Sequence, residues 1–318
     1  MIVYGPVPSR RLGHSIGINN IPPKTCSYSC IYCQLGRTDR MQVKRREFYK
    51  PEEIFHGAEL KIKQLNSKNE HVDYFSFVPD GEPTLDINLG TEIDLLRYFD
   101  IKIAVITNAS LIWMDDVKED LMKADWVSVS IDAVDEDTWR KIDRPHGSLR
   151  QQDIFNGIIE FSKTYKGTLV TETMLVDGVN DHDACIKKVA EHLGVIHPKK
   201  AYLLVPTRPP AENSIKRSSR ESLVNAAEII RSISGAHVEC ITGDEKEEGF
   251  FFSEDIVNDL LSISSVHPVR EDIVNEILEK RNVDKAVIDD LLKRDMIVEF
   301  LYEGKKFYRK NLKNKQKT

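Results

Sequence analysis

The stretch Cys26-Ser27-Tyr28-Ser29-Cys30-Ile31-Tyr32-Cys33 holds three of the five cysteines of this 318-residue chain. An odd number of cysteines with such close clustering favours a metal or cluster site over a disulfide framework, and it fits a reducing compartment. A [4Fe–4S] cluster takes thiolate ligands, and three thiolates on one loop would leave the fourth iron open to a small chelating ligand. We therefore expect Cys26, Cys30 and Cys33 to bind such a cluster.

Zinc is the competing interpretation of these three cysteines. A structural zinc site closes with four protein ligands, and the chain has no second cysteine pair. Cys185 and Cys240 are isolated, and we expect both to be buried, apolar-like residues. His14 or His56 would have to supply the fourth zinc ligand, and the spacing favours neither.

Outward from this loop, apolar runs rich in Val and Ile alternate with segments of helical period. Apolar strands separated by helices indicate a parallel sheet covered by helices on its outer face. Six such repeats predict an α/β fold, a partial (β/α)6 TIM-type barrel. The predicted strands are Ser15–Ile18, Val72–Val78, Lys102–Thr107, Trp126–Ile131, Leu169–Val176 and Ala201–Val205, and Ala236–Ile241 would extend the sheet.

After Gly243 the pattern changes, and we predict three parts of the chain. Residues 1–245 form the partial barrel, 246–265 a linker helix, and 266–318 a small winged-helix-like domain with a frayed tail. The basis for the last part is two helical segments followed by two short strand-like runs around a turn. They are Val269–Glu279, Lys285–Arg294, Met296–Tyr302 and Lys306–Tyr308.

Composition indicates an ordinary globular protein, with 41% hydrophobic and 30% charged residues and a net charge of −6. From Ser264 to Thr318 there are 13 Lys and Arg against 10 Asp and Glu, which leaves −9 for the rest of the chain. No apolar run approaches the roughly 20 residues of a membrane span, and no secretory signal is evident. We expect a cytoplasmic protein without a membrane partner.

The loop resembles the CxxxCxφC signature of the radical S-adenosylmethionine (SAM) superfamily, with Tyr32 as the aromatic residue before the last cysteine. The resemblance implies an enzyme in which the open iron of the [4Fe–4S] cluster binds SAM. Reductive cleavage of SAM then gives a 5′-deoxyadenosyl radical that acts on a substrate. It also implies a partial (β/α)6 barrel and an external electron donor such as flavodoxin or ferredoxin.

The resemblance assigns SAM contacts to residues at the ends of successive strands. Gly81, Glu82, Pro83 and Thr84 match the motif that meets the SAM amino group, although they also read as a capped turn before a helix. The other implied contacts are Thr107 and Asn108 at the end of the third strand, Ser130 and Asp132 at the end of the fourth, and Val205 at the end of the sixth. Ser130 and Asp132 could equally cap the helix that follows.

The opening motif from Pro8 to Gly13 resembles one in iron–sulfur oxidoreductases related to wyosine-type tRNA-modifying enzymes. It implies a tRNA base as substrate, with a peptide or a small metabolite as alternatives. Arg10 and Arg11 in this motif could bind a phosphate or carboxylate or form a solvated basic turn, and Arg208 is a comparable candidate.

The lysines and arginines of the C-terminal part favour contact with nucleic acid, whereas the acidic residues of its second helix favour protein, peptide or purely structural docking. Two other functions remain open. One is a zinc-binding winged-helix regulator, and the other is a cluster protein for electron transfer alone.

Overall fold

An eight-stranded sheet forms the body of the protein in the computed structural model, which describes residues 2–67, 70–242, 256–266, 268–302 and 304–311. The strand order is β1-β2-β5-β6-β7-β8-β9-β10, and every neighbouring pair is parallel except β1 with β2. This is the sheet of a partial barrel, and all seven predicted strands are confirmed. They are β2 (Gly13–Ile18), β5 (Tyr74–Phe77), β6 (Lys102–Thr107), β7 (Trp126–Ser130), β8 (Thr168–Met174), β9 (Lys200–Leu204) and β10 (Val238–Ile241).

The first strand, β1 (Val3–Ser9), was not predicted. Gly5, Pro6 and Pro8 interrupt its apolar pattern, and proline is disfavoured within a sheet because it cannot donate to the ladder. β1 pairs only with β2, so it is an edge strand, where proline is tolerated. The Arg10–Leu12 turn therefore joins two antiparallel strands and does not simply precede the first one.

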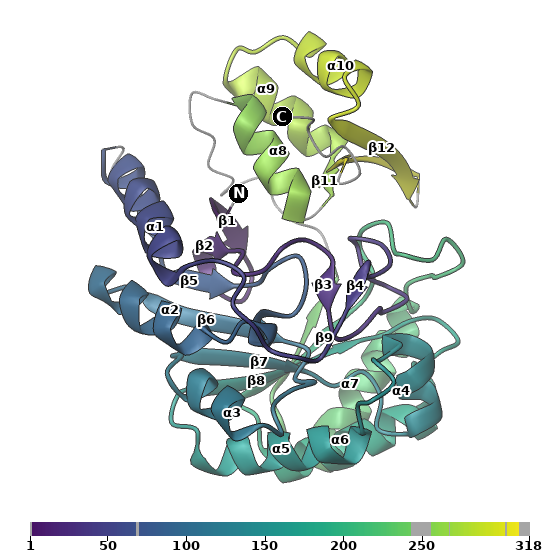
Figure 1. Cartoon of the computed structure of the whole chain (residues 1–318). Helices are drawn as coiled ribbons and strands as arrows, with labels where there is room; N and C mark the ends of the chain where they lie inside the picture. The colour runs from purple at the N-terminus through teal and green to yellow at the C-terminus, as the bar shows by residue number, and fades with distance from the viewer. Residues whose placement is uncertain (1, 68–69, 243–255, 267, 303, 312–318) are drawn as a thin grey trace.

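Helices cover the outer face of the sheet (Figure 1). Leu and Ile at helical spacing face the strands, as in α6, where Ile186, Val189 and Leu193 are buried. The sequence analysis missed α4, whose start is capped by Asp135 accepting a hydrogen bond from the Thr138 amide. The helices of the body are α1 (Pro51–Asn66), α2 (Leu89–Leu96), α3 (Asp115–Met122), α4 (Glu136–Asp143), α5 (Gln151–Thr164), α6 (Asp183–Ile196) and α7 (Arg220–Ser234).

Short elements sit at the carboxyl ends of the parallel strands. β3 (Thr25–Cys26) pairs with β4 (Arg40–Met41), and both belong to the long segment after β2. The 3-10 turn η1 (Pro83–Leu85) follows β5, whereas a second 3-10 turn, η2 (Arg97–Phe99), extends α2 and leads into the amino end of β6. The carboxyl ends of parallel strands are where barrel enzymes hold their chemistry, and the predicted SAM contacts lie there.

The C-terminal part has a hydrophobic core of its own, in which Leu260, Ile273, Ile277 and Leu291 are buried. Its helices pack on a three-stranded antiparallel sheet of order β11-β13-β12. The two helices and two strand runs that the sequence predicted are present, whereas the winged-helix assignment stays a prediction. The elements are α8 (Ile256–Val266), β11 (Val269–Arg270), α9 (Glu271–Lys280), α10 (Ala286–Lys293), β12 (Ile297–Tyr302) and β13 (Lys305–Lys310).

This C-terminal part lies against β1 and the cysteine loop (Figure 1). Val7 of β1 packs on its core, and the Tyr302 hydroxyl donates to the Pro206 carbonyl at 3.2 Å. The Arg309 guanidinium donates to the Gln34 carbonyl at 3.0 Å, one residue after Cys33. The predicted domain boundaries stay predictions, because 243–255 and 312–318 lie outside the described residues. Within the described ranges no helix has the length and apolar character needed to cross a membrane.

Candidate functional site

The three clustered cysteines lie on the segment that follows β2, and all three are half-buried. Backbone hydrogen bonds tie this segment to the end of α4, since Ser29 N and Ile31 N donate to the carbonyls of Asp143 and Ile142 at 3.0 and 2.9 Å. A cluster loop held by a helix end in this way keeps its thiols in place before a ligand arrives.

The chemistry of this donor set fits a cluster. Within the described ranges no three His, Cys, Asp or Glu side chains have the geometry to hold a single metal ion. Each cysteine of a [4Fe–4S] site binds a different iron, so that geometry is not required here. Burial raises the pKa of all three thiols, that of Cys26 to about 12. Bound iron would reverse this, because a coordinating thiol is deprotonated.

The two remaining cysteines lie elsewhere. Cys185 is buried on α6, as predicted, and its thiol lies 3.3 Å from a carboxylate oxygen of Asp135. Cys240 is exposed on β10, so the prediction that it is buried was wrong. β10 is the edge strand of the sheet, and the outward-facing positions of an edge strand meet solvent.

The predicted motif at residues 81–84 packs directly on the start of the cysteine loop. A Cβ on Gly81 would lie 1.8 Å from the Thr25 carbonyl oxygen, so only glycine fits there. The Glu82 amide donates to that same oxygen at 3.2 Å. Pro83 begins η1, and its carbonyl accepts from the Asn20 side chain at 3.2 Å.

The Glu82 carboxylate is fully buried and gathers four hydrogen bonds. One oxygen accepts from the Thr84 amide at 3.1 Å, the Thr84 hydroxyl at 2.6 Å and the Thr107 hydroxyl at 2.6 Å. The other oxygen accepts from the Asn108 amide at 2.8 Å, and the Asn108 side chain lies 3.6 Å from the sulfur of Cys26. Burial raises the pKa of Glu82, and these donors oppose that rise. Four of the predicted contacts thus form one network beside a cysteine.

Neither Ser130 nor Asp132 caps the following helix, because Asp135 does. The Ser130 hydroxyl lies 3.5 Å from the carbonyl of Thr107, at the edge of the network. Asp132 is buried at the carboxyl end of β7, where its carboxylate accepts from the Met174 amide at 2.7 Å.

Asp132 also joins a group of side chains that the sequence analysis did not assemble. Its second oxygen accepts a hydrogen bond from the Tyr32 hydroxyl. Its neighbour Asp143 accepts from the Cys30 thiol at 3.4 Å. Burial raises the pKa of Asp132 to about 6, and burial together with the charge of Asp132 raises that of Asp143 well above its usual value. Two carboxyls that are buried close together do not both ionise readily, and this pair lies beside Cys30.

Arg45 is a further residue that sequence reasoning missed. Its side chain is 4% exposed, and it donates to the carbonyls of Thr84 and Asp86 at 2.9 and 2.8 Å. It also forms ion pairs with Asp116 and Asp120 of α3. Arg45 lies within the basic run Lys44-Arg45-Arg46. The sequence alone does not show that Arg45 is buried while Lys44 and Arg46 are exposed.

A cavity of about 420 Å³ extends from the cysteine loop into the barrel. Cys30, Tyr32 and Cys33 line it, and so does Val205 from the loop after β9. Its size falls within the range of small-molecule sites. The cavity is therefore the place where a cluster on these thiols would face bound molecules.

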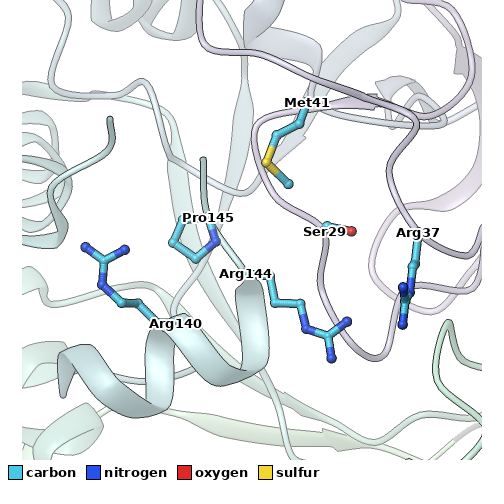
Figure 2. A pocket seen from close by; sticks show the side chains of 6 residues that line it. All are labelled: Ser29, Arg37, Met41, Arg140, Arg144 and Pro145. Atoms are coloured by element: carbon cyan, nitrogen blue, oxygen red, sulfur yellow. The ribbon is translucent and has the colours of Figure 1, made fainter. Parts of the chain in front are cut away.

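A second hollow, of about 590 Å³, lies on the outer side of the same loop and is lined by Ser29, Met41, Pro145 and three arginines. Figure 2 shows Arg144 directed toward Arg37 and Ser29, whereas Arg140 points away beyond Pro145. Arg37 and Arg144 both bind Glu212, at 2.9 and 2.6 Å. Arg140 pairs with Glu136 at 2.8 Å, so the three arginines exceed their two carboxylate partners by one positive charge, one residue away from Cys30.

The chain is similar to known proteins in sequence and in fold. Residues 20–187 match the family described as the Radical SAM superfamily. UPF0026 protein MJ1312 of Methanocaldococcus jannaschii is 47% identical over 317 residues, which cover 100% of this chain and 98% of that protein.

Two solved structures share the fold. A radical SAM methyltransferase from Sphaerobacter thermophilus has a TM-score of 0.56 at 15% identity, over 73% of this chain and 67% of that one. TYW1 with a lysine–pyruvate adduct bound has a TM-score of 0.53 at 19% identity, over 69% and 74%.

Proposed function

The chain belongs to the radical SAM superfamily, and from that premise we propose that it is an enzyme that cleaves SAM reductively at a [4Fe–4S] cluster held by Cys26, Cys30 and Cys33. The observation that carries the proposal is the position of these thiols. They are half-buried on one loop, two of them line the cavity, and the third adjoins the Glu82 network. When bound, the cluster supplies the electron that breaks a carbon–sulfur bond of SAM and yields a 5′-deoxyadenosyl radical.

The chain's own residues would bind and orient SAM beside the cluster. The Oε2 atom of Glu82 accepts one hydrogen bond, from the Asn108 amide. A carboxylate oxygen can accept a second one, which the ammonium group of SAM would donate. Asn108 and the carboxyl pair of Asp132 and Asp143 supply further polar groups at the same end of the barrel. Val205 adds an apolar surface that suits an adenine ring.

The electron donor would approach from outside the barrel. The hollow around Arg37, Arg140 and Arg144 adjoins the cysteine loop and has one positive charge in excess of its carboxylate partners, and positive patches attract acidic partners. An acidic redox protein such as flavodoxin or ferredoxin has the matching charge. The substrate we propose first is a tRNA base, with a peptide or small metabolite as the alternative, and the C-terminal part would help to bind a large substrate.

The test is anaerobic reconstitution of wild type, Cys30→Ala and Cys240→Ala. Wild type should hold about four iron and four sulfide per chain with broad visible absorbance. Cys240→Ala should do the same, because Cys240 is exposed and remote from the cysteine loop. Cys30→Ala should lose the absorbance. Incubation with SAM and dithionite, or with reduced flavodoxin, should release 5′-deoxyadenosine from the first two proteins only.

Other outcomes of this experiment would favour the other functions. One zinc per chain would favour the zinc-binding regulator. A cluster that forms but releases no 5′-deoxyadenosine would favour electron transfer alone. Release above the uncoupled rate on adding bulk tRNA would support a tRNA substrate.

A further inference from the structure

We propose that the barrel cavity binds a small organic anion, with its carboxylate or phosphate held by Arg10 and Arg11 at the end of the cavity opposite the cysteines. This inference rests on the proposed function and, among the substrates named there, favours a small metabolite over a tRNA base.

The placement follows from the direction of β2. The Arg10–Leu12 turn precedes β2, and the cysteine loop follows it, so the two lie at opposite ends of that strand. The six residues of β2 span roughly 20 Å at about 3.3 Å per residue. Arg10, Arg11, Cys30 and Cys33 all line the one cavity, which therefore runs along the barrel from the thiols to the arginines.

The charge of the cavity wall is positive. Among the described residues that line it, three are arginines (Arg10, Arg11 and Arg208) and none is Asp or Glu. The wall otherwise consists of apolar, cysteine and neutral polar side chains. Guanidinium groups bind carboxylate and phosphate through charge-assisted hydrogen bonds, and a water-poor cavity strengthens such contacts. A cavity lined in this way favours an anion and disfavours a cation.

Arg11 is oriented by an ion pair inside the barrel. Its Nη1 binds Oε1 of Glu172 on β8, and the same oxygen accepts from the Ser128 hydroxyl at 2.6 Å. The side chains of Arg11 and Glu172 are only 21% and 12% exposed. A guanidinium carries five N–H donors, so one ion pair leaves donors for a second acceptor. The sequence also allowed a solvated basic turn, and Arg11 does not fit that alternative because its guanidinium is ion-paired inside the barrel.

The turn itself is held before any ligand arrives. The Ser9 hydroxyl accepts from the amides of Arg11 and Leu12 at 3.3 and 3.2 Å. Gly13 has a φ of +66°, which favours glycine, and a Cβ there would displace the Asp73 carboxylate, which accepts from the His14 amide at 2.8 Å. A preorganised site loses less entropy on binding. The two arginines are thus displayed by a rigid turn.

The test is calorimetric titration of the reconstituted protein with inorganic phosphate and with malonate. We expect wild type to bind at least one of these anions, and the tighter one indicates whether the substrate carries a phosphate or a carboxylate. Arg10→Gln should weaken binding about tenfold, since a lost charge-assisted hydrogen bond has about that effect. Arg220→Gln, on the exposed start of α7, should bind as wild type does.

The role of Arg11 is tested with a double substitution, because Arg11→Gln alone would leave the Glu172 carboxylate largely buried without its ion-pair partner. Arg11→Gln/Glu172→Gln removes both charges and should also lose anion binding while retaining its far-UV circular dichroism. Absence of binding of both anions to wild type, or equal affinities of Arg10→Gln and Arg220→Gln, would overturn the inference.

The measurements distinguish a failure of this inference from a failure of the proposed function. Iron content and 5′-deoxyadenosine release without substrate report on the cluster and SAM, and they should be unchanged in the control Arg220→Gln. A protein that cleaves SAM but binds neither anion refutes only this inference. A protein without a cluster refutes the proposed function, whatever its anion affinity.

Discussion

At the residue scale, Glu82 is a buried carboxylate on which four hydrogen bonds converge. Each of its carboxylate oxygens accepts a backbone amide, that of Thr84 on one side and that of Asn108 on the other. The hydroxyls of Thr84 and Thr107 complete the shell. The carboxylate therefore joins the ends of β5 and β6 next to Cys26, and its position depends on all of these donors.

Replacing Glu82 by Gln should destabilise the protein. In either orientation the amide NH₂ would face a backbone N–H, and that buried donor would lose its acceptor. We expect a free energy of unfolding lower by about 1–3 kcal/mol, measured by urea denaturation of the unloaded protein, together with weaker SAM binding to the reconstituted one. Glu191→Gln, on the exposed side of α6, is the control and should stay within about 0.5 kcal/mol of wild type. Coincident urea transitions of Glu82→Gln and wild type would contradict the prediction.

At the scale of elements, Arg45 clamps three parts of the molecule together. It lies on the segment after β4, donates to carbonyls on either side of Leu85 in η1, and pairs with two aspartates of α3. The clamp fixes the turn that carries Glu82 and Thr84. The position of the site thus depends on contacts well outside the cavity.

Removing this clamp should loosen the site. Arg45→Gln leaves Asp120 and two carbonyls without their donor, and we expect unfolding free energy to fall by about 3 kcal/mol. Arg45→Lys should recover part of this loss, because one ammonium keeps the charge but cannot reach all four partners. Arg46→Gln is the neighbouring control, since the exposed Arg46 stacks on Phe48. Equal denaturation midpoints for Arg45→Gln and Arg46→Gln would disprove the role of Arg45.

At the scale of the whole molecule, buried acids couple folding to pH. Burial raises the pKa of Glu92 to about 9, and those of Asp80 and Asp86 to about 7. An acid whose pKa rises on folding binds its proton more tightly in the native state than in the unfolded state. Its contribution to stability is therefore greatest at low pH and falls as pH rises toward the native pKa.

The free energy of unfolding should accordingly decrease between about pH 5 and about pH 9. Glu92 alone contributes a slope on the order of 1 kcal/mol per pH unit in this window. Glu92→Gln removes the titrating group, so its stability should vary less with pH and exceed that of wild type at about pH 8. Urea unfolding at several pH values measures both slopes, with Glu191→Gln as the control. Parallel pH profiles for wild type and Glu92→Gln would refute the assignment.

The sequence by itself determined seven of the eight strands of the sheet and the clustering of three cysteines on one loop, because both follow from local patterns. Apolar runs alternating with helical periods need only neighbouring residues to be recognised, and all seven predicted strands are present. The spacing of Cys26, Cys30 and Cys33 likewise lies within one loop. β1 was not predicted because its prolines are untypical of a strand. An edge strand tolerates proline, since one side of its backbone has no partner strand and needs no N–H donors there.

Only the tertiary structure decided which distant side chains meet. Arg11 with Glu172, Cys30 with Asp143, and Arg45 with Asp116 and Asp120 are each pairs of residues far apart in the chain. Their contacts depend on how strands and helices pack, and a local pattern does not record that packing. The arginines of the cavity wall, the carboxyl pair beside Cys30 and the clamp on η1 all arise from such packing, and a local sequence pattern does not predict them.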